Sequence, residues 1–214
     1  MVVAIDGPAG SGKGTVSSIL AKECNLLYID TGVTYRCIAL KVLEKNIDLN
    51  DKDAIIDIAS NIDIKFTSDG VTYLDGVDVS NKIRTMEVTR IVSPISSIPE
   101  VRSYMVDLQR KMAANNDVVM EGRDITTVVL PNASYKFYLD ASIGVRAERR
   151  YEQNREKGIN IPLEEIKESI EQRDYNDMHK EVGALKRTDE QIYIDTSHMS
   201  IEEVVDMIKK YIGR

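Results

Sequence analysis

The sequence predicts an α/β fold with a parallel core sheet and a small antiparallel insert. Short apolar runs, typical of buried strands, alternate along the chain with segments whose apolar residues recur every three or four positions, typical of helices. Between residues 62 and 79 this alternation stops, and short strands joined by Asp-Gly turns take its place. The chain has 214 residues, of which 43% are hydrophobic and 29% charged, enough for the core of a single domain.

The first part of the chain predicts strand, helix, strand and helix in that order. Residues 2–5 form a buried strand, and residues 26–29 form a second one. The helix between them has an apolar face of Val16, Ile19, Leu20 and Cys24, and the helix that follows has one of Tyr35, Ile38, Ala39, Val42 and Leu43. Strands joined through a helix lie parallel in one sheet.

The middle of the chain predicts three antiparallel strands. Residues 62–66 alternate apolar and polar side chains, and residues 71–74 and 77–79 give two more strands, after turns at 68–70 and 75–76. We expect an inserted subdomain over about 61–95, with a meander at the sheet edge as the alternative.

The last part resumes the core pattern. A helix is expected to begin near Pro99, and strands are expected over residues 118–120, 135–139 and 192–195. A charged stretch covers residues 146–157, and another helix follows Pro162. Ser200 and Glu203 have the spacing of a capping box at the start of a final helix.

Composition excludes several classes of protein. With 28 basic and 35 acidic residues, the net charge is −7, which argues against a general nucleic-acid-binding surface. No apolar run approaches the length of a membrane span, and the N-terminal pattern is not that of a signal peptide. We therefore expect a cytoplasmic protein with no nucleic-acid or membrane partner. Cys24 and Cys37 are expected to be reduced core thiols, with a disulfide between them as the alternative, and we also expect a monomer.

The strongest motif is a glycine-rich loop between the first strand and the first helix. It consists of Gly7, Pro8, Ala9, Gly10, Ser11, Gly12, Lys13, Gly14 and Thr15. Glycines let backbone N–H groups surround phosphate oxygens, the helix N-terminus adds partial positive charge, and Lys13 adds a full one. This pattern predicts a site for the phosphates of a nucleotide.

Two residues could organise Mg²⁺ at this site. Gly14 follows the lysine, so Thr15 supplies the nearest hydroxyl after it. Glu121 follows a buried strand, where its carboxylate could take part, directly or through water.

Two further motifs follow strands, where open α/β sheets bind ligands. In the first, Thr31 offers a hydroxyl and Arg36 a planar donor group suited to phosphate, with a helix cap and a surface arginine as the alternative. In the second, Arg123 could hold phosphate and Asp124 could accept from an amino group, with a loop salt bridge as the alternative.

Basic residues recur at helical spacing in the last third of the chain. Arg146, Arg149 and Arg150 share one helix face, while Arg173, Asp177 and Lys180 share another. A solvated helix face explains such charges in most proteins. Beside a phosphate loop they also fit a lid that neutralises phosphates during phosphoryl transfer.

A phosphate loop alone does not identify a kinase. A GTPase should carry Asn-Lys-x-Asp, and the nearest segment, residues 81–84, ends in arginine instead. A kinase for another small acceptor and a non-catalytic ATP-binding module remain as alternatives.

Taken together, these motifs resemble those of the bacterial cytidylate kinases, which are nucleoside monophosphate kinases. The similarity covers Ile5-Asp6 with the phosphate loop that follows, Asp30-Thr31-Gly32 with Tyr35-Arg36, Ile83-Arg84, Ser93, residues 99–102, Gly122-Arg123-Asp124 with Thr127-Val128-Val129, and Arg173-Asp174 with Asp177. The resemblance implies a P-loop kinase that transfers the γ-phosphoryl group of ATP to CMP or dCMP with Mg²⁺. It also implies that the insert binds the monophosphate and that a helical lid covers about 146–165.

The resemblance also implies roles for individual residues. Thr31, Arg36 and Arg123 face the acceptor phosphate, and Ser93, Arg102 and Asp124 face the cytosine. Arg173 and Asp177 lie near the acceptor sugar and phosphates, and Arg149 and Arg150 belong to the ATP side of the lid. The residues expected to act in catalysis are Lys13, Arg123, Arg173 and Lys180.

The chain departs from the family pattern at a few positions. Val33-Thr34 replaces a small residue followed by Met or Ile, and Thr126 replaces a glycine. Lys180 replaces an arginine, and Gly183-Ala184 replaces Ala-Pro. Lysine lacks the bidentate donor group of arginine, so the lid near Lys180 should differ most from the family.

Overall fold

The computed structural model describes residues 1–67, 70–156 and 158–214. They form two compact units. The first consists of Met1–Leu26 with Asp117–Arg214, and the second of Leu27–Asn116. The chain thus leaves the first unit after one helix and returns to it for the second half.

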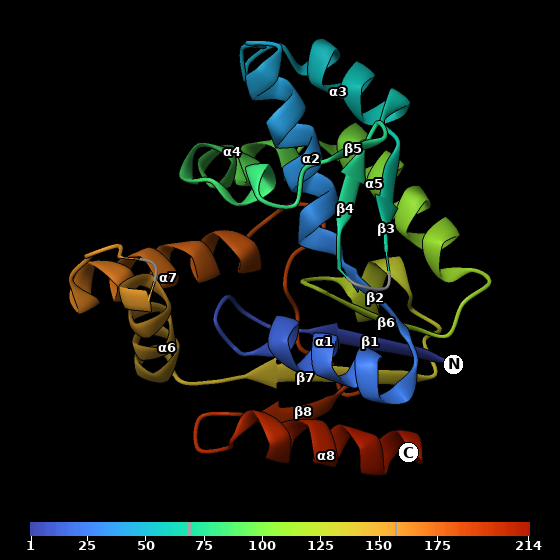
Figure 1. The fold of residues 1–214 in the computed structure, drawn as a ribbon, viewed down its shortest axis with the longest axis vertical. Coiled ribbons are helices and arrows are strands. Elements are labelled where there is room, and N and C mark those ends of the chain that lie inside the picture. The colour runs from blue at the N-terminus through green and yellow to red at the C-terminus, as the bar shows by residue number, and fades with distance from the viewer. Residues whose placement is uncertain (68–69, 157) are drawn as a thin grey trace. The chain divides into compact units, whose positions relative to one another are not determined.

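Parallel strands form the centre of the first unit. They are β1 (Val2–Asp6), β6 (Val118–Gly122), β7 (Tyr135–Asp140) and β8 (Ile192–Asp195), and they lie side by side in the order β6-β1-β7-β8 (Figure 1). Asp6 at the end of β1 pairs in register with Gly122 on one side and Tyr138 on the other. Because the strands are parallel, their carboxyl ends meet at one edge, and the loops after β1 and β6 are neighbours.

The helices of the first unit pack in two pairs. The first pair is α1 (Lys13–Cys24) and α8 (Ile201–Ile212), and the second is α6 (Ile143–Glu156) and α7 (Leu163–Met178). The α6–α7 pair has its own small core of Ala147, Ile166 and Ile170. The expected capping box of α8 is confirmed, because Ser200 and Glu203 bond each other's backbone N–H.

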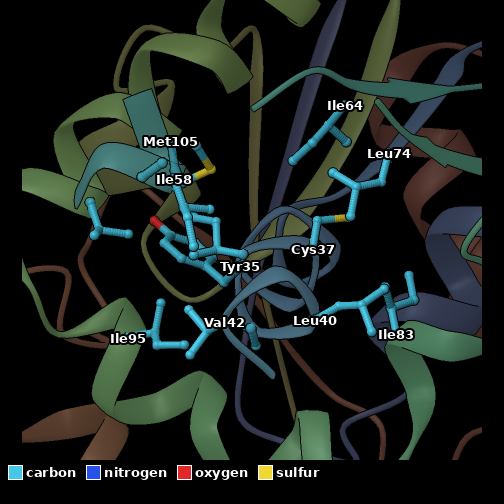
Figure 2. Close-up of a cluster of buried hydrophobic side chains, with 14 of the residues drawn as sticks. Tyr35, Cys37, Leu40, Val42, Ile58, Ile64, Leu74, Ile83, Ile95 and Met105 are labelled. Carbon is cyan, nitrogen blue, oxygen red and sulfur yellow. The ribbon is translucent and has the colours of Figure 1, made fainter. Parts of the chain in front are cut away.

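The second unit is built around α2. Its elements are β2 (Leu27–Asp30), α2 (Thr31–Glu44), α3 (Lys52–Asn61), β3 (Ile64–Phe66), β4 (Thr72–Leu74), β5 (Val77–Asp78), the short turn η1 (Lys82–Arg84), α4 (Met86–Ser96) and α5 (Pro99–Ala113). Figure 2 shows that Tyr35, Cys37, Leu40 and Val42 of α2 lie among apolar side chains from the surrounding elements. Burial of this helix on several sides makes it the centre of the unit's core.

The expected α/β class is confirmed, and so are the three antiparallel strands, in the order β3-β4-β5. The turn expected at 68–70 includes residues 68 and 69, which lie outside the described residues, as does residue 157 of the charged stretch. The limits of the insert, about 61–95, and of the lid, about 146–165, stay predictions.

Two helices were not expected. Helix α3 has a regular apolar face of Ile55, Ile58 and Ala59 after the N-cap Asp51, so its signal was present in the sequence. Helix α4 contains Pro94, which interrupts helical patterns. Over the described part of the chain, no helix is both long and apolar enough to cross a membrane.

Candidate active site

The glycine-rich loop connects β1 to α1, as the sequence predicts. A Cβ on Gly7 would lie 2.0 Å from the carbonyl oxygen of Leu139, so only glycine fits there. Gly10 and Gly12 have φ angles of 79° and 87°, a left-handed conformation that side chains rarely adopt. The backbone therefore turns tightly and leads into the N-terminus of α1 at Lys13.

Lys13 lies inside this loop and is 6% exposed. Its ammonium group donates a hydrogen bond to the carbonyl oxygen of Pro8 at 3.0 Å and lies 3.9 Å from a carboxylate oxygen of Glu121. An ammonium group has three donors, so it can bind phosphate while it stays anchored to the loop. The loop, the helix N-terminus and Lys13 together make the end of β1 electrostatically suited to bind an anion.

The residues expected to organise Mg²⁺ differ in burial. Glu121 is 7% exposed at the end of β6, whereas the side chain of Thr15 is exposed on α1. The described residues contain no group of three or more His, Cys, Asp or Glu side chains that could hold a metal ion. This donor set fits a magnesium ion that is bound mainly by nucleotide phosphates and completed by one or two protein oxygens.

A second charged cluster surrounds Asp177 on α7. Its carboxylate lies 2.7 Å from Nε of Arg123, 3.3 Å from Nζ of Lys180 and 3.9 Å from Nε of Arg173. Burial raises the pKa of Asp177, but these three cations bring it below its ordinary value, so the carboxylate is ionised. Three of the four residues expected to act in catalysis thus meet at one carboxylate.

One detail of this cluster corrects the sequence expectation. Helix α7 ends at Met178, so Lys180 does not lie on its face. The ammonium group nevertheless reaches back to Asp177, because the chain turns at the helix end.

The three basic residues at helical spacing on α6 have different surroundings. Arg146 is 4% exposed, donates to the carbonyl oxygens of Ala9 and Ala141, and pairs with Asp174 at 2.6 Å. Arg146 therefore joins the loop to α6 and α7, and it does not lie on a solvated helix face. A Cβ on Gly10 would lie 3.1 Å from Cβ of Arg146, so the loop and α6 touch here.

Arg149 and Arg150 are less buried than Arg146. Arg149 is partly buried and donates to the carbonyl and hydroxyl oxygens of Thr196, at 2.7 and 3.1 Å. Thr196 in turn donates from its hydroxyl to the carbonyl oxygen of Ser11 in the phosphate loop. Arg150 is exposed.

In the second unit, the motif at the start of α2 is fixed by hydrogen bonds. Thr31 begins the helix and is 5% exposed. The guanidinium group of Arg36 donates to the carbonyl oxygen of Ile83 and the hydroxyl oxygen of Thr89, at 3.0 and 2.9 Å. It is therefore held against η1 and α4 and is not a loose surface arginine.

The residues expected to face the cytosine also differ in burial. Arg102 on α5 is 5% exposed, with its guanidinium carbon 5.7 Å from the ring centre of Tyr35. Ser93 on α4 is exposed, and Asp124 in the first unit is 6% exposed. Arg102 therefore does not lie on the solvent-exposed surface of its helix.

Two departures from the family pattern form buried hydrogen bonds. The hydroxyl of Thr34 donates to the carbonyl oxygen of Thr31 and accepts from the side-chain amide of Gln109. The hydroxyl of Thr126 donates to Asp6 at 2.6 Å.

Sequence reasoning missed several residues that contact the site residues, namely Asp6, Asp174, Gln191 and Thr196. For Asp6 a signal was present, because an aspartate stands in an apolar strand directly before the glycine loop.

Comparison with known proteins identifies the family. Residues 3–214 match the family described as Cytidylate kinase. A cytidylate kinase from Lactobacillus johnsonii is 46% identical over 217 residues, covering 100% of this chain and 94% of that protein. Another from Caldanaerobacter subterraneus is 47% identical over 212 residues, covering 99% and 94% of the two chains.

Solved structures agree at the level of the fold. The shikimate kinase from Bacteroides thetaiotaomicron has a TM-score of 0.52 at 12% identity, covering 100% of this chain and 99% of its own. At this identity the likeness concerns the fold alone. The full-length sequence matches are decisive: the chain belongs to the cytidylate kinase family.

Proposed function

We propose that the protein transfers the γ-phosphoryl group of ATP to CMP and dCMP, with Mg²⁺, in pyrimidine nucleotide metabolism. The observation that carries this proposal is the buried Lys13 in a glycine loop at the N-terminus of α1, in a chain of this family. The membership of the family implies ATP as the co-substrate. The identity of the acceptor, the metal and the roles of single residues belong to the proposal.

In the proposed reaction, an oxygen of the acceptor phosphate attacks the γ-phosphorus of ATP. The new P–O bond forms as the bond between that phosphorus and the oxygen bridging to the β-phosphate breaks, so ADP leaves. The acceptor is already an anion, and no protein base is needed. Catalysis therefore depends on positioning and on the neutralisation of charge.

On the donor side, the loop N–H groups and Lys13 would bind the β- and γ-phosphates, and Lys13 would stabilise charge on the transferred group. Arg149 and Arg150 would lie on the ATP side of the lid. Mg²⁺ would be held chiefly by the phosphates and organised by Glu121 and the Thr15 hydroxyl, and would supply further positive charge.

On the acceptor side, Arg123, Arg173 and Lys180 would bind phosphate, because all three already converge on Asp177. Thr31 and Arg36 would also bind the acceptor phosphate. Arg102, Ser93 and Asp124 would bind the cytosine. Its amino group needs an acceptor and its N3 a donor, and a carboxylate and an arginine supply these.

A coupled assay of ADP release tests the proposal with a panel of nucleoside monophosphates and with shikimate. We expect turnover with CMP and dCMP and little with AMP, GMP or shikimate. A preference for another acceptor would favour a different small-molecule kinase. Nucleotide binding without turnover would favour a non-catalytic module.

The Lys13→Met variant tests the donor site. It keeps an apolar stem but loses the charge, so turnover should fall by roughly 10²-fold or more, since charge stabilisation in such sites contributes several kcal/mol. Unfolding temperature should change little. Near-normal turnover in the folded variant would remove Lys13 from its assigned role.

A further inference from the structure

A buried carboxylate lies at the end of β1, directly before the glycine loop. Asp6 is 0% exposed. Its two oxygens accept hydrogen bonds from the backbone N–H of Ile125 at 2.8 Å and of Thr126 at 2.9 Å, and from the Thr126 hydroxyl at 2.6 Å. All three donors belong to η2 (Ile125–Val129), a single helical turn that follows β6.

Gln191 fixes the direction of the protons in this network. Its amide oxygen accepts from the backbone N–H of Thr188 at 2.7 Å, so its amide nitrogen faces Thr126 and donates to that hydroxyl oxygen. The single hydroxyl proton of Thr126 is then directed to Asp6. Asp6 accepts three times and needs no proton of its own, so these donors stabilise its ionised form. Burial holds the pKa of Asp6 above its ordinary value, and the donors offset part of that rise.

The position of Asp6 relates this network to the residues proposed to bind the acceptor. The backbone of Asp6 pairs in register with Gly122, and its side chain bonds the N–H of Ile125. Between these two points lie only Arg123 and Asp124. One residue therefore fixes both ends of the two-residue segment that would bind the acceptor phosphate and the cytosine.

The phosphate loop is held differently. Gly7 packs with its own backbone against the carbonyl group of Leu139, and the β1 backbone is paired on both sides. The three hydrogen bonds that the Asp6 carboxylate accepts all come from η2, so the loss of this carboxylate should affect the acceptor segment more than the donor loop.

We propose that Asp6, Thr126 and Gln191 are positioning residues that hold Arg123 and Asp124 in the conformation that binds the acceptor nucleotide. This inference rests on the proposed function. Thr126 is the central member, because its hydroxyl connects the carboxylate of Asp6 to the amide of Gln191. Gln191 also donates to the carbonyl oxygen of Lys186, so its amide connects the segment before β8 to Thr126.

The test compares Thr126→Val with Thr126→Ser, and uses Thr127→Val as the matched control. Valine has the shape of threonine but no hydroxyl, whereas serine keeps it. Thr127 is the neighbouring threonine on η2 and is more exposed. For Thr126→Val we expect KM for CMP to rise by about 5- to 30-fold, the effect of losing a hydrogen bond to a buried charged group. KM for ATP should change less than about twofold, because the donor loop is held by its own backbone.

Thr126→Ser and Thr127→Val should both keep KM for CMP near that of the wild type. Equal rises in both KM values for Thr126→Val, or a lower unfolding temperature with unchanged kinetics, would overturn the inference. If Thr126→Val does not fold, Gln191→Met serves instead. It leaves Asp6 with its three donors, so KM for CMP should rise by a smaller factor, and an unchanged KM for CMP would again overturn the inference.

The wild type separates this inference from the proposed function. If the wild type does not phosphorylate CMP, the proposed function fails and the inference fails with it. If the wild type uses CMP and Thr126→Val behaves like it, only the inference fails.

Discussion

Asp177 is the residue that holds the proposed phosphate-binding cations together. Three cations, from Arg123, Arg173 and Lys180, gather around one carboxylate. Without a negative centre they would repel one another, and their side chains would extend into solvent. The carboxylate keeps them together, and its low pKa means that it stays ionised at neutral pH.

Lys180 supports a prediction at this scale, because its neighbour His179 offers a control. The side chain of Lys180 is 13% exposed and lies 3.3 Å from Asp177, whereas His179 is exposed and stacks on Tyr175. Lys180→Ala should lower turnover by about 10-fold or more, as expected for a lost charged hydrogen bond, and His179→Ala should leave turnover near that of the wild type. Lys180→Arg should preserve or raise activity.

Steady-state rates at saturating ATP and CMP check this prediction. If Lys180→Ala and His179→Ala have the same turnover, Lys180 does not take part in catalysis.

Arg102 supports a prediction about base recognition. Arginine is always charged and can donate to N3 of cytosine, whereas uracil presents an N–H there. Arg102→Met should lower catalytic efficiency with CMP by roughly 10- to 150-fold, equivalent to about 1.5–3 kcal/mol, and leave ATP affinity nearly unchanged. UMP should lose less, so the CMP-to-UMP ratio should shrink. An unchanged ratio with normal ATP affinity would remove Arg102 from the residues that read the base.

At the scale of elements, α6 shows that basic residues at regular helical spacing can have different surroundings. Arg146 faces the phosphate loop and pairs with Asp174 of α7, while Arg150, four residues on, is exposed. The buried pair is retained because the guanidinium group also satisfies two backbone carbonyl groups, which offsets its desolvation. Helices α6 and α7 are thereby joined to the loop through one side chain.

Helix α8 offers a stability prediction that is separate from activity. Ser200 accepts from the N–H of Glu203 at 3.2 Å, and the Glu203 carboxylate accepts from the N–H of Ser200 at 2.8 Å. Ser200→Ala should lower the free energy of unfolding by about 1 kcal/mol without changing turnover. Ser18→Ala, at an exposed position inside α1, should be neutral or slightly stabilising, because alanine favours helix interiors. Denaturant titrations of both variants compare the two effects.

At the scale of the whole molecule, each unit buries a weak acid in its neutral form. In the second unit, burial is the main reason that the pKa of the Cys37 thiol rises to about 12. In the first unit, burial, with Asp140 nearby, raises the pKa of the Tyr138 phenol to about 12. In the unfolded chain the two groups have their ordinary pKa values of 9.0 and 10.0.

These two groups predict a loss of stability at alkaline pH. Between pH 9 and 12 the unfolded chain releases protons that the folded chain retains, so rising pH favours unfolding. Each group should add a slope of up to about 1.4 kcal/mol per pH unit within its window. Stability from these groups is therefore fully present below pH 9 and declines above it.

Urea titrations from pH 8 to 11 test this expectation. Tyr138→Phe should flatten the decline above pH 10, and Tyr211→Phe, at an exposed position, should follow the wild-type profile. A Tyr138→Phe profile parallel to that of the wild type would contradict the assignment.

The sequence by itself determined the type of most elements and the location of the phosphate loop. Element type depends on the local spacing of apolar residues, which alternate in strands and recur every three or four positions in helices. The phosphate loop is recognised from the glycines directly before Lys13, because conformational freedom is a property of glycine itself. It also placed the antiparallel strands, because Asp-Gly turns are expected between them. Helix α4 was missed because it contains Pro94, and proline inside a helix is unfavourable.

Only the tertiary structure decided which charged side chains are buried in contacts with other parts of the chain and which remain exposed. Arg146 and Arg150 look alike along the chain, but Arg146 bonds Ala9, 137 positions away. Asp6 likewise meets Thr126 across 120 positions. Such partners are brought together by strand order and helix packing, which depend on the burial of the whole core, so no local pattern in the sequence could reveal them.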